Sequence, residues 1–363
     1  MKILVLTNYD EGLYKFRKEV LEELCKKNKV IVSCPHGEYI DKIKKIGCKY
    51  IGQEFNRRGT NPIKDIEQFI GYVEIIKKVK PDVVLTYTIK PNVYGGLACQ
   101  YTKTPYIANV TGLGTSIENG GIMQFLTTNL YKLGLRKANC VFFQNKNNRE
   151  TFQKMNMVKG HTRLIPGSGV NLNFHSFEEY PSDENIIHFL FVGRIMKDKG
   201  INEIVEAIKT VHIEYPDISF DIVGGCDEDY EHYLEETEKT GFIHYRGRQD
   251  EMHDFYKNSH CVVLPSYHEG MANVLLEGAS TGRPVIASDI PGCRETFIEG
   301  KTGFGCKPKS TESLVAAIRK FLALSNTEKQ QMGIAGRNKV KSEFDRSIII
   351  QAYLDEINKI GRN

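Results

Sequence analysis

The chain has 363 residues, 40% of them hydrophobic, which suits two domains of about 150 to 200 residues better than one core. No run of about 18 apolar residues occurs and the first strand leads directly into polar sequence, so we expect no membrane span, no signal peptide and a cytoplasmic protein. Nine cysteines without a Cys-x-x-Cys pair indicate reduced thiols, and exclude a disulfide framework or a zinc site.

The charge is unevenly distributed along the chain. Residues 1–170 carry 27 Lys and Arg against 14 Asp and Glu, a net +13, whereas the remainder carries 22 against 31, a net −9. Nucleic acid, an anionic membrane surface or a phosphorylated ligand would each suit the basic half. No arginine-rich tract, zinc-finger spacing or helix-turn-helix pattern occurs, so we expect no nucleic-acid partner. A solvated lysine-rich surface is the simpler alternative.

The first half alternates short apolar strands with amphipathic helices. Strands are expected at residues 3–6, 30–32, 81–86, 106–110 and 140–143. The helix at 122–135 places five apolar residues on one face: Ile122, Phe125, Leu126, Leu130 and Leu133. Core packing is the default interpretation of this face. The alternative is membrane contact, which would involve four neighbouring side chains: Met123, Leu135, Arg136 and Lys137.

The strand and helix pattern starts again in the second half, after a polar segment at 177–185 that predicts a linker. Further strands are expected at 187–192, 218–223, 243–245, 262–264 and 285–287. Repeats of this kind form right-handed parallel sheets. We therefore predict an α/β protein with two Rossmann-like, doubly wound domains that face a cleft. The expected bounds are 1–170 and 171–345, with 346–363 forming a C-terminal helix that returns to the first domain.

Two glutamates, Glu269 and Glu277, form the most specific pattern in the chain. Glu269 should lie in a turn between strand and helix, and Glu277 about two turns into that helix, which should end at a left-handed Gly282. The free N–H groups of Gly270 to Val274 would point toward an anion such as a diphosphate. Carboxylates beside an anion suit hydroxyls, so Glu277 could hold a ribose and Glu269 a sugar. A solvated turn residue and an exposed helix residue are the simpler alternative.

Glycines and cations follow the other strands of the second domain. Gly193 would let a ligand approach the backbone, and Arg194 with Lys199 could neutralise a leaving diphosphate. Arg246 and Arg248 follow the strand at 243–245 and suit a base edge or a phosphate. Each residue alone is more often a turn glycine or a surface cation. Together they should meet at the carboxyl ends of the strands of one domain.

These motifs resemble the retaining family-4 glycosyltransferases, whose two Rossmann domains form the GT-B fold, and the likeness covers nearly the whole chain. It rests on Gly193-Arg194, Lys199-Gly200, Pro265-Ser266, Glu269-Gly270, Glu277 and Gly282-x-Pro284-Val-Ile286. Within this family the chain is most similar to bacterial enzymes that extend capsular, lipopolysaccharide or glycan-precursor chains on a polyprenyl diphosphate. Three first-half motifs carry that narrower likeness: Tyr14-x-Phe16-Arg17, Lys90-Pro-Asn-Val-Tyr-Gly-Gly96 and Val110-Thr-Gly-Leu-Gly114.

The resemblance implies a UDP-sugar donor in the second domain and a lipid-linked glycan acceptor in the first. The implied catalytic residues are Glu269, Arg194 and Lys199. The implied donor-binding residues are Glu277, Gly193, Gly270, Met271, Ala272, Asn273, Val274 and Arg248. The candidate acceptor-binding residues are Gly12, Tyr14, Arg17, Lys90, Thr111 and Gly112. Many relatives also carry a histidine near the donor sugar, which segment 87–92 lacks, so Lys90, Thr111 and the turn at 112–114 are candidates to replace it.

Retention without an enzyme nucleophile implies that the acceptor hydroxyl attacks the face from which the diphosphate leaves, with cations stabilising the charge. We expect no metal or other cofactor, because Asp227-Glu-Asp229, which resembles an Asp-x-Asp metal motif, precedes a helix that it should cap. The expected place of action is the inner face of the plasma membrane, with its anionic surface as a partner. Two alternatives remain. A nucleotide-sugar 2-epimerase would release product without acceptor, and a glycan-binding scaffold would never consume the donor.

Overall fold

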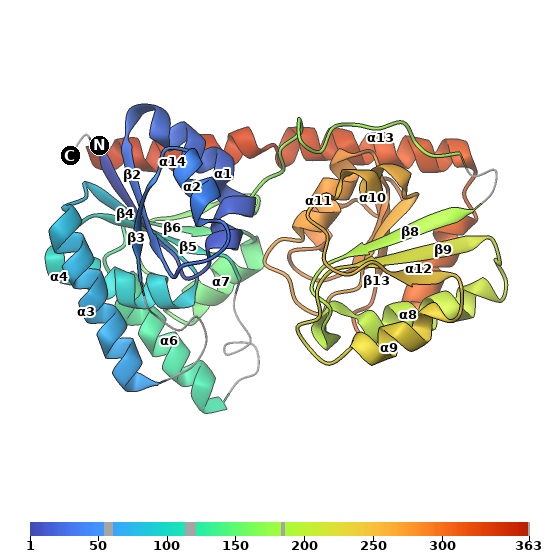
Figure 1. Ribbon diagram of the computed structural model, residues 1–363, viewed down its shortest axis with the longest axis horizontal. Coiled ribbons are helices and arrows are strands. Elements are labelled where there is room, and N and C mark those ends of the chain that lie inside the picture. Colours follow the sequence, from blue (N-terminus) through green and yellow to red (C-terminus); the bar gives the residue numbers. More distant parts are fainter. Residues whose placement is uncertain (54–60, 113–120, 183–185, 362–363) are drawn as a thin grey trace. The chain divides into compact units, whose positions relative to one another are not determined.

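The computed structural model describes residues 1–53, 61–112, 121–182 and 186–361 (Figure 1). The chain forms two compact units. Unit 1 comprises Met1–Ser168 together with Arg346–Asn363, and unit 2 comprises Gly169–Asp345. Each unit contains one parallel sheet with helices on both faces. The predicted α/β class and doubly wound architecture are therefore confirmed.

The sheet of unit 1 has seven parallel strands in the order β3-β2-β1-β4-β5-β6-β7. Their bounds are β1 (Lys2–Leu6), β2 (Lys29–Cys34), β3 (Lys49–Gly52), β4 (Val83–Tyr87), β5 (Tyr106–Val110), β6 (Cys140–Phe143) and β7 (Thr162–Leu164). The central strands β4 and β5 are buried along their whole length because helices cover both faces. The sequence also indicates that a run beginning at Arg163 closes this sheet, and β7 lies at the start of that run. The other edge strand, β3, was not predicted, since it is short, partly exposed and lacks an apolar run.

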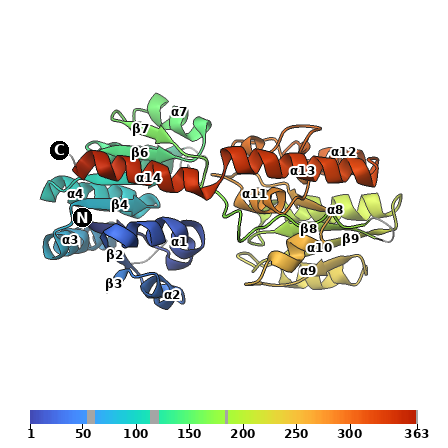
Figure 2. The same cartoon turned by 90° about the horizontal axis from the view of Figure 1, so that it is seen from above.

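Helices of unit 1 cover both faces of this sheet. They are α1 (Asp10–Lys27), α2 (Ile40–Lys45), α3 (Pro62–Val79), the π-helix η1 (Pro91–Gly95), α4 (Gly96–Thr102), α6 (Gly121–Leu135), α7 (Lys146–Lys154) and α14 (Arg346–Gly361). Figure 2 shows α14 lying along unit 1, between α1 and the β6–β7 edge. Its Ile349, Tyr353 and Ile357 are buried in the core beside α1. The Tyr353 hydroxyl also donates a hydrogen bond to Asn109 on β5.

Helix α6 packs in the opposite orientation to the default prediction. Ile122 and Phe125 are 78% and 68% exposed, and Leu126 and Leu133 are also exposed. The buried residues of α6 are instead Thr127, Thr128, Tyr131, Gly134 and Leu135. The prediction of core packing is therefore wrong for four of its five residues, and Leu135 lies inside rather than outside.

Close backbone contacts explain this orientation of α6. A Cβ atom added to Gly134 would lie 2.6 Å from the Cα atom of Val93 in η1, and one added to Gly96 would lie 2.2 Å from the Gly134 carbonyl oxygen. Position 134 must therefore be glycine where α6 crosses η1 and α4, and this contact turns the face that carries Gly134 toward the sheet. Ile122, Phe125, Leu126 and Leu133 then point away from the sheet.

Unit 2 has six parallel strands in the order β10-β9-β8-β11-β12-β13. Their bounds are β8 (Ile187–Val192), β9 (Ile218–Val223), β10 (Ile243–Tyr245), β11 (Cys261–Leu264), β12 (Val285–Ser288) and β13 (Gly303–Cys306). The helices are η2 (Lys197–Lys199), α8 (Ile201–His212), α9 (Glu231–Glu238), α10 (His253–Asn258), α11 (Asn273–Ser280), η3 (Arg294–Thr296), α12 (Thr311–Leu322) and α13 (Asn326–Glu343). Strand β13 was not predicted, because two of its four residues are glycine.

The described part of the predicted linker belongs to unit 2. The Tyr180 hydroxyl donates to the His260 carbonyl (2.8 Å), and Arg283 Nη2 donates to the Glu179 carbonyl (2.8 Å). Gly282 adopts the predicted left-handed conformation, with φ +87°, and lies against the Phe177 ring. Residues 177–182 of the predicted linker are therefore part of unit 2.

The structure bears on the predicted lack of a membrane span and on the predicted reduced cysteines. Within the described ranges, no helix combines the length and the apolar character needed to cross a bilayer. All nine cysteines are free thiols, as predicted, although Cys25 Sγ and Cys48 Sγ lie only 3.6 Å apart.

Candidate functional site

The loops after β8 and β11 pack against each other at the carboxyl edge of the unit 2 sheet. Gly200, with φ +75°, lies so close to Pro265 that an added Cβ would come within 2.5 Å of the Pro265 carbonyl oxygen. The Tyr267 N–H donates to the Asp198 carbonyl (2.8 Å). A glycine between Lys199 and α8 is therefore a requirement of this packing.

This packing brings together two predicted site residues that are 70 positions apart. Lys199 Nζ forms an ion pair with Glu269 Oε1, and the two side chains are only 17% and 13% exposed. The Ser266 hydroxyl donates to the same carboxylate oxygen (2.8 Å). The carboxylate is thus held in one orientation, and its charge is balanced in a partly desolvated position.

A third loop, after β12, supports the turn that carries Glu269. Gly292 has φ +89°, and a Cβ on it would lie 2.6 Å from the Glu269 carbonyl oxygen. The Gly292 carbonyl accepts the Ala272 N–H (2.8 Å), and its own N–H donates to Glu295 Oε2 (2.7 Å). Sequence analysis missed Gly292. The dipeptide Pro291-Gly292, shortly after the end of β12 at Ser288, was the signal that could have revealed this turn.

Glu277 is oriented by a buried tyrosine. Helix α11 begins at Asn273, so Glu277 lies about one turn into the helix rather than the predicted two. The Tyr256 hydroxyl donates to Glu277 Oε2 (2.7 Å). Burial, together with the adjacent Glu277 carboxylate, raises the pKa of Tyr256 well above its usual value, so the tyrosine remains a proton donor at neutral pH. Tyr256 was not predicted, since nothing in its sequence context distinguishes it from a core residue.

The turn from Gly270 to Val274 has fewer free amides than predicted. The Ala272 N–H is bonded to Gly292, and the Asn273 N–H donates to the Met271 carbonyl (3.0 Å). The side chains of Met271 and Ala272 are buried in the core, so only their main chains can face a ligand. Asn273 Oδ1 is a buried acceptor without a partner among the described residues. The prediction of five free N–H groups is therefore wrong for Ala272 and Asn273.

The loops after β8, β9 and β10 form one hydrogen-bonded rim of bare backbone. The Gly193 N–H donates to the Val223 carbonyl (3.0 Å), and the Gly224 N–H donates to the Gly247 carbonyl (2.9 Å). Gly224 has φ +153°, and a Cβ there would lie 1.7 Å from the Gly193 carbonyl oxygen. No other residue fits at Gly224, which keeps this edge of the sheet free of side chains.

Arg194 is tied to the segment that was expected to cap α9. Its Nη1 pairs with Asp227 Oδ2 at 2.6 Å, and Glu228 Oε2 accepts the Lys197 N–H at 2.8 Å. Helix α9 begins at Glu231, and its N-cap residue Tyr230 makes no side-chain cap. Asp227 and Glu228 therefore fix the β8–α8 loop, and the predicted capping role is wrong.

The two arginines after β10 point to different places. Arg248 is exposed at the rim, beside the bare backbone of Gly225. Arg246 pairs with Asp221 through Nε (2.6 Å) and lines a separate cavity of about 440 Å³, which begins at the amino ends of the strands. Of these two predicted phosphate or base contacts, the structure places only Arg248 at the rim.

In unit 1, Thr111 and Gly112 line a small cavity at the carboxyl ends of β4 and β5. Its volume is about 140 Å³, and the lining also includes Thr88, Ile89, Asn92 and Tyr131. The rest of the predicted turn, residues 113 and 114, lies outside the described residues. Thr88 has φ +72°, a conformation that costs a β-branched residue about 1 to 3 kcal/mol. Such strain often marks functional positions, and sequence analysis did not detect it.

Lys90 does not reach this cavity. Its Nζ pairs with Asp65 Oδ1 at 2.9 Å, and the other oxygen of that carboxylate accepts the Tyr94 hydroxyl at 2.9 Å. Lys90 is therefore paired within unit 1 and lies outside the lining of this cavity.

The three predicted acceptor residues on α1 have different neighbours. Gly12 lies against the Tyr9 ring, with an added Cβ 2.7 Å from it, and the Tyr14 ring packs on Tyr39 with centroids 5.4 Å apart. Arg17 is buried, and its guanidinium lies 5.7 Å from the centroid of the Tyr87 ring at the end of β4. Its Nε is buried without a hydrogen-bond partner among the described residues. These residues do not form one cluster.

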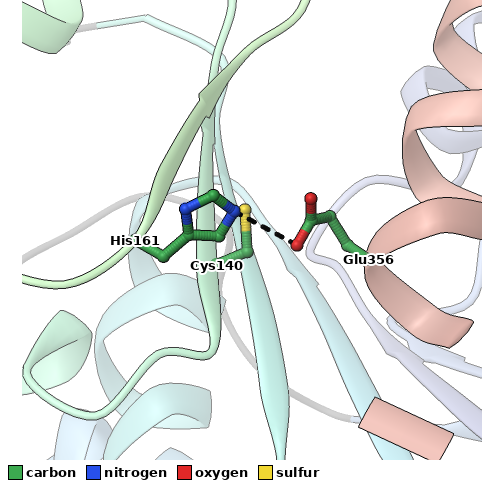
Figure 3. Close-up of side chains that lie close together, drawn as sticks. All are labelled: Cys140, His161 and Glu356. Atoms are coloured by element: carbon green, nitrogen blue, oxygen red, sulfur yellow. Dashed lines mark ion pairs between the residues drawn. The ribbon is translucent and has the colours of Figure 1, made fainter. Parts of the chain in front are cut away.

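One group among the described residues has the donor atoms of a metal site: Cys140, His161 and Glu356 (Figure 3). His161 Nε2 lies 3.2 Å from Glu356 Oε2. The other oxygen of Glu356 already contacts Arg163 Nη1 (3.2 Å) and Lys359 Nζ (2.7 Å). Because Cys140 begins β6, this group is at the amino edge of the sheet, away from the candidate residues. We interpret it as an electrostatic anchor for α14.

Comparison with known proteins extends these observations to both units. The model named Glycosyl transferases group 1 matches residues 174–339, and the model named Glycosyl transferase 4-like matches residues 2–145. The chain is 28% identical to the N,N'-diacetylbacillosaminyl-diphospho-undecaprenol alpha-1,3-N-acetylgalactosaminyltransferase of Campylobacter jejuni, over 100% of both proteins. It is 25% identical to a capsular polysaccharide biosynthesis glycosyltransferase of Staphylococcus aureus, over 81% of this chain and 80% of that one.

The fold agrees with these matches. HepE of Anabaena, solved in complex with UDP and glucose, superposes with a TM-score of 0.81 at 17% identity, covering 99% of this chain and 100% of that one. The two family models match the halves of the chain that form the two parallel sheets. The chain belongs to the glycosyltransferases that these models describe, with the GT-B fold.

Proposed function

We propose that this protein is a retaining glycosyltransferase that moves a hexose or N-acetylhexosamine from a UDP-sugar to a polyprenyl-diphosphate-linked glycan in surface polysaccharide synthesis. The observation that carries the proposal is the Lys199–Glu269 pair, held at the carboxyl edge of the unit 2 sheet beside the start of α11. The Campylobacter relative is named for transfer to a diphospho-undecaprenol acceptor, and HepE was solved with UDP and glucose. Both names support this choice of substrates.

The donor would bind unit 2. Its diphosphate would lie against Arg194 and Lys199, and the lack of a side chain at Gly193 and at Gly270 would let it approach the main chain. Glu269 would accept hydroxyls of the sugar, and Glu277, already oriented by Tyr256, would accept those of the ribose. Arg248 would meet the base or a phosphate.

The reaction would depend on positive charge rather than on an enzyme nucleophile. As the bond between C1 of the sugar and the β-phosphate oxygen broke, its electrons would pass to the diphosphate. The acceptor oxygen would bond to C1 on the same face, and its hydroxyl proton would pass to the departing phosphate oxygen. Lys199 is only 17% exposed, so its attraction for the growing negative charge is screened less than in bulk water. Arg194 and Lys199 would supply this stabilisation without a metal ion.

The acceptor would bind unit 1, at the carboxyl ends of its strands. The cavity lined by Thr111 and Gly112 is the part of the predicted acceptor set that forms a concave surface. The net +13 of residues 1–170 suits a diphosphate-linked acceptor and an anionic membrane surface at the inner face of the plasma membrane.

A single assay tests this function. The purified chain is incubated with individual UDP-sugars, with and without a polyprenyl-diphosphate-linked glycan, and UDP release and the anomeric configuration of the product are measured. We expect acceptor-dependent UDP release, retained configuration and no loss of activity with a chelator. Release of an epimerised sugar without acceptor would favour a 2-epimerase. Donor binding without any consumption would favour a glycan-binding scaffold.

A further inference from the structure

We propose that α3 and α6 of unit 1 form a docking surface for an anionic lipid bilayer. The inference rests on the proposed function, because a lipid-linked acceptor must be reached at a membrane. The exposed large apolar residues of the two helices are Ile63, Ile66 and Ile70 on α3 and Ile122, Met123, Phe125, Leu126 and Leu133 on α6. We call these eight residues the apolar face.

The apolar face is continuous along each helix. On α3 its residues recur at intervals of three and four, and so do Ile122, Phe125 and Leu126 on α6, so each set forms a stripe. Both helices pack against η1 and α4, and Tyr101 of α4, which lies between them, is also exposed. A soluble protein rarely leaves several large apolar side chains exposed together unless they contact a partner.

The position of the two helices relates the apolar face to the acceptor cavity. Helices α3 and α6 follow β3 and β5, so both begin on the carboxyl side of the sheet, and Figure 1 shows their first turns at the same end of unit 1. Tyr131 of α6 lines the cavity that also contains Thr111 and Gly112. A membrane against α6 would therefore be next to the site where a lipid-linked substrate would enter.

The charge around α6 favours an anionic bilayer as the partner, whereas α3 also exposes Glu67 and Glu74 and contributes mainly apolar contact. Residues 121–149 contain no Asp or Glu, but they contain Lys132, Arg136 and Lys137, and both Arg136 and Lys137 are exposed. Helix α6 has 15 residues and is about 22 Å long, too short to span a hydrocarbon core of about 30 Å. Apolar side chains next to basic ones, on a helix of this length, suit insertion into the interface between headgroups and acyl chains.

Vesicle binding tests the proposal without donor or acceptor. The full chain is sedimented with phosphatidylethanolamine vesicles that contain one third phosphatidylglycerol, in 0.1 M salt. We expect binding, and at least a tenfold weaker partition coefficient for the double variant Ile122→Gln/Phe125→Gln, because two apolar side chains no longer enter lipid. The double variant Arg136→Gln/Lys137→Gln should weaken binding roughly 30-fold, at about 1 kcal/mol per cation. The matched control is Ile213→Gln, which changes an isoleucine that is 84% exposed on unit 2.

The outcomes separate this inference from the proposed function. Turnover of Ile122→Gln/Phe125→Gln should fall on an undecaprenyl-linked acceptor in vesicles but remain within about twofold of the wild type on a water-soluble, short-chain acceptor. Absence of vesicle binding by the wild type, or an equal loss in Ile213→Gln, would overturn the docking surface. The docking surface would also be overturned if the wild type were a dimer and Ile122→Gln/Phe125→Gln were a monomer, since a second copy of the chain would then cover the apolar face. If the chain bound vesicles but had no transferase activity, the proposed function would be rejected and the docking surface would stand.

Discussion

Lys199 and Glu269 form an ion pair, so the proposed donor would exchange this one interaction for two. Its diphosphate would take the cation, and its sugar hydroxyls would take the carboxylate. Neither an isolated sugar nor an isolated phosphate offers both groups. We therefore expect free sugars and inorganic phosphate to bind far more weakly than the intact nucleotide sugar.

Substitution of either proposed diphosphate cation should reduce turnover. We expect Lys199→Ala and Arg194→Ala each to lower kcat by roughly 100-fold or more, because each removes a charge contact that strengthens as the leaving group becomes negative. The measurement is UDP release under saturating donor and acceptor. The control is Arg246→Ala, an arginine that pairs with Asp221 in a separate cavity and should change turnover less than about threefold. Full activity in the double variant of Lys199 and Arg194 would show that other groups stabilise the charge.

Gly292 should be far less tolerant of substitution than Gly300. Both have positive φ, so alanine costs about 1 to 3 kcal/mol at either position. An added Cβ at Gly292 also collides with the Glu269 carbonyl, whereas the same atom at Gly300 meets nothing within 4 Å. We expect Gly292→Ala to lower both the melting temperature and kcat further than Gly300→Ala does. Equal effects in thermal unfolding and UDP release would show that the contact with Glu269 is unimportant.

At the scale of single elements, the hydrophobic pattern predicted the strands that helices cover on both faces of the sheet. The central strands have long apolar runs and were found, whereas the edge strand β3 has no such run and was missed. The orientation of α6 could not be predicted, because it depends on the contact between Gly134 and η1, which sequence periodicity does not contain.

The candidate site shows the same division. Short-range patterns placed Glu269 in a turn and Gly282 at a helix end. The partners of the predicted residues were missed, because Tyr256, Asp227 and Gly292 come from other loops or helices and meet the site only through the fold. Tertiary contacts of this kind have no local signal in a single sequence.

His260, the residue directly before β11, should make unit 2 less stable in acid. His260 accepts the His188 N–H at Nδ1 (3.0 Å), and its Nε2 lies 3.1 Å from the Ser182 carbonyl, which fits a neutral ring. Burial, with nearby Arg283 and Lys329, lowers the pKa of His260 to about 4, below its value of about 6.5 in the unfolded chain. Between these values the unfolded state binds more protons, so stability is present above pH 6.5 and is lost as the pH falls toward 4.

We expect this histidine to contribute about 2 to 3 kcal/mol to the loss of unfolding free energy between pH 7.5 and 4.5. The measurement is urea unfolding at both pH values for the wild type and His260→Gln. Glutamine can keep both hydrogen bonds but does not titrate. Between pH 7.5 and 4.5 the variant should therefore lose less unfolding free energy than the wild type, by the contribution of His260. All other acid-sensitive groups are the same in the wild type and in His260→Gln. If both proteins lost the same unfolding free energy, those other groups and not His260 would cause the acid sensitivity.

At the scale of the whole molecule, unit 1 is built from two distant parts of the chain. Helix α14 contributes Ile349, Tyr353 and Ile357 to its core, and Arg163 of β7 pairs with both Asp355 and Glu356. Arg346 also pairs with Glu19 on α1. Stability of the first 168 residues therefore depends on residues that follow the whole of unit 2.

Tyr353→Ala should destabilise unit 1 by about 3 to 5 kcal/mol, because it empties a fully buried aromatic position. It also removes the hydroxyl donor to Asn109. Ile348→Ala is the matched control on the same helix, since Ile348 is exposed and should change stability by less than about 0.5 kcal/mol. Chemical unfolding, with limited proteolysis to locate the cleaved unit, measures both. Similar stability of the two variants would mean that α14 adds little to unit 1.

The discontinuity of unit 1 also sets an order of events during translation. Residues Met1–Ser168 leave the ribosome without α14, and the ribosome then adds Gly169–Asp345 at about 5 to 20 residues per second, which takes roughly 10 to 35 seconds. During that interval the nascent N-terminal segment exposes the surface that Tyr353 and its neighbours later cover, while unit 2 can already fold as one uninterrupted stretch. The unit synthesised first is thus completed last.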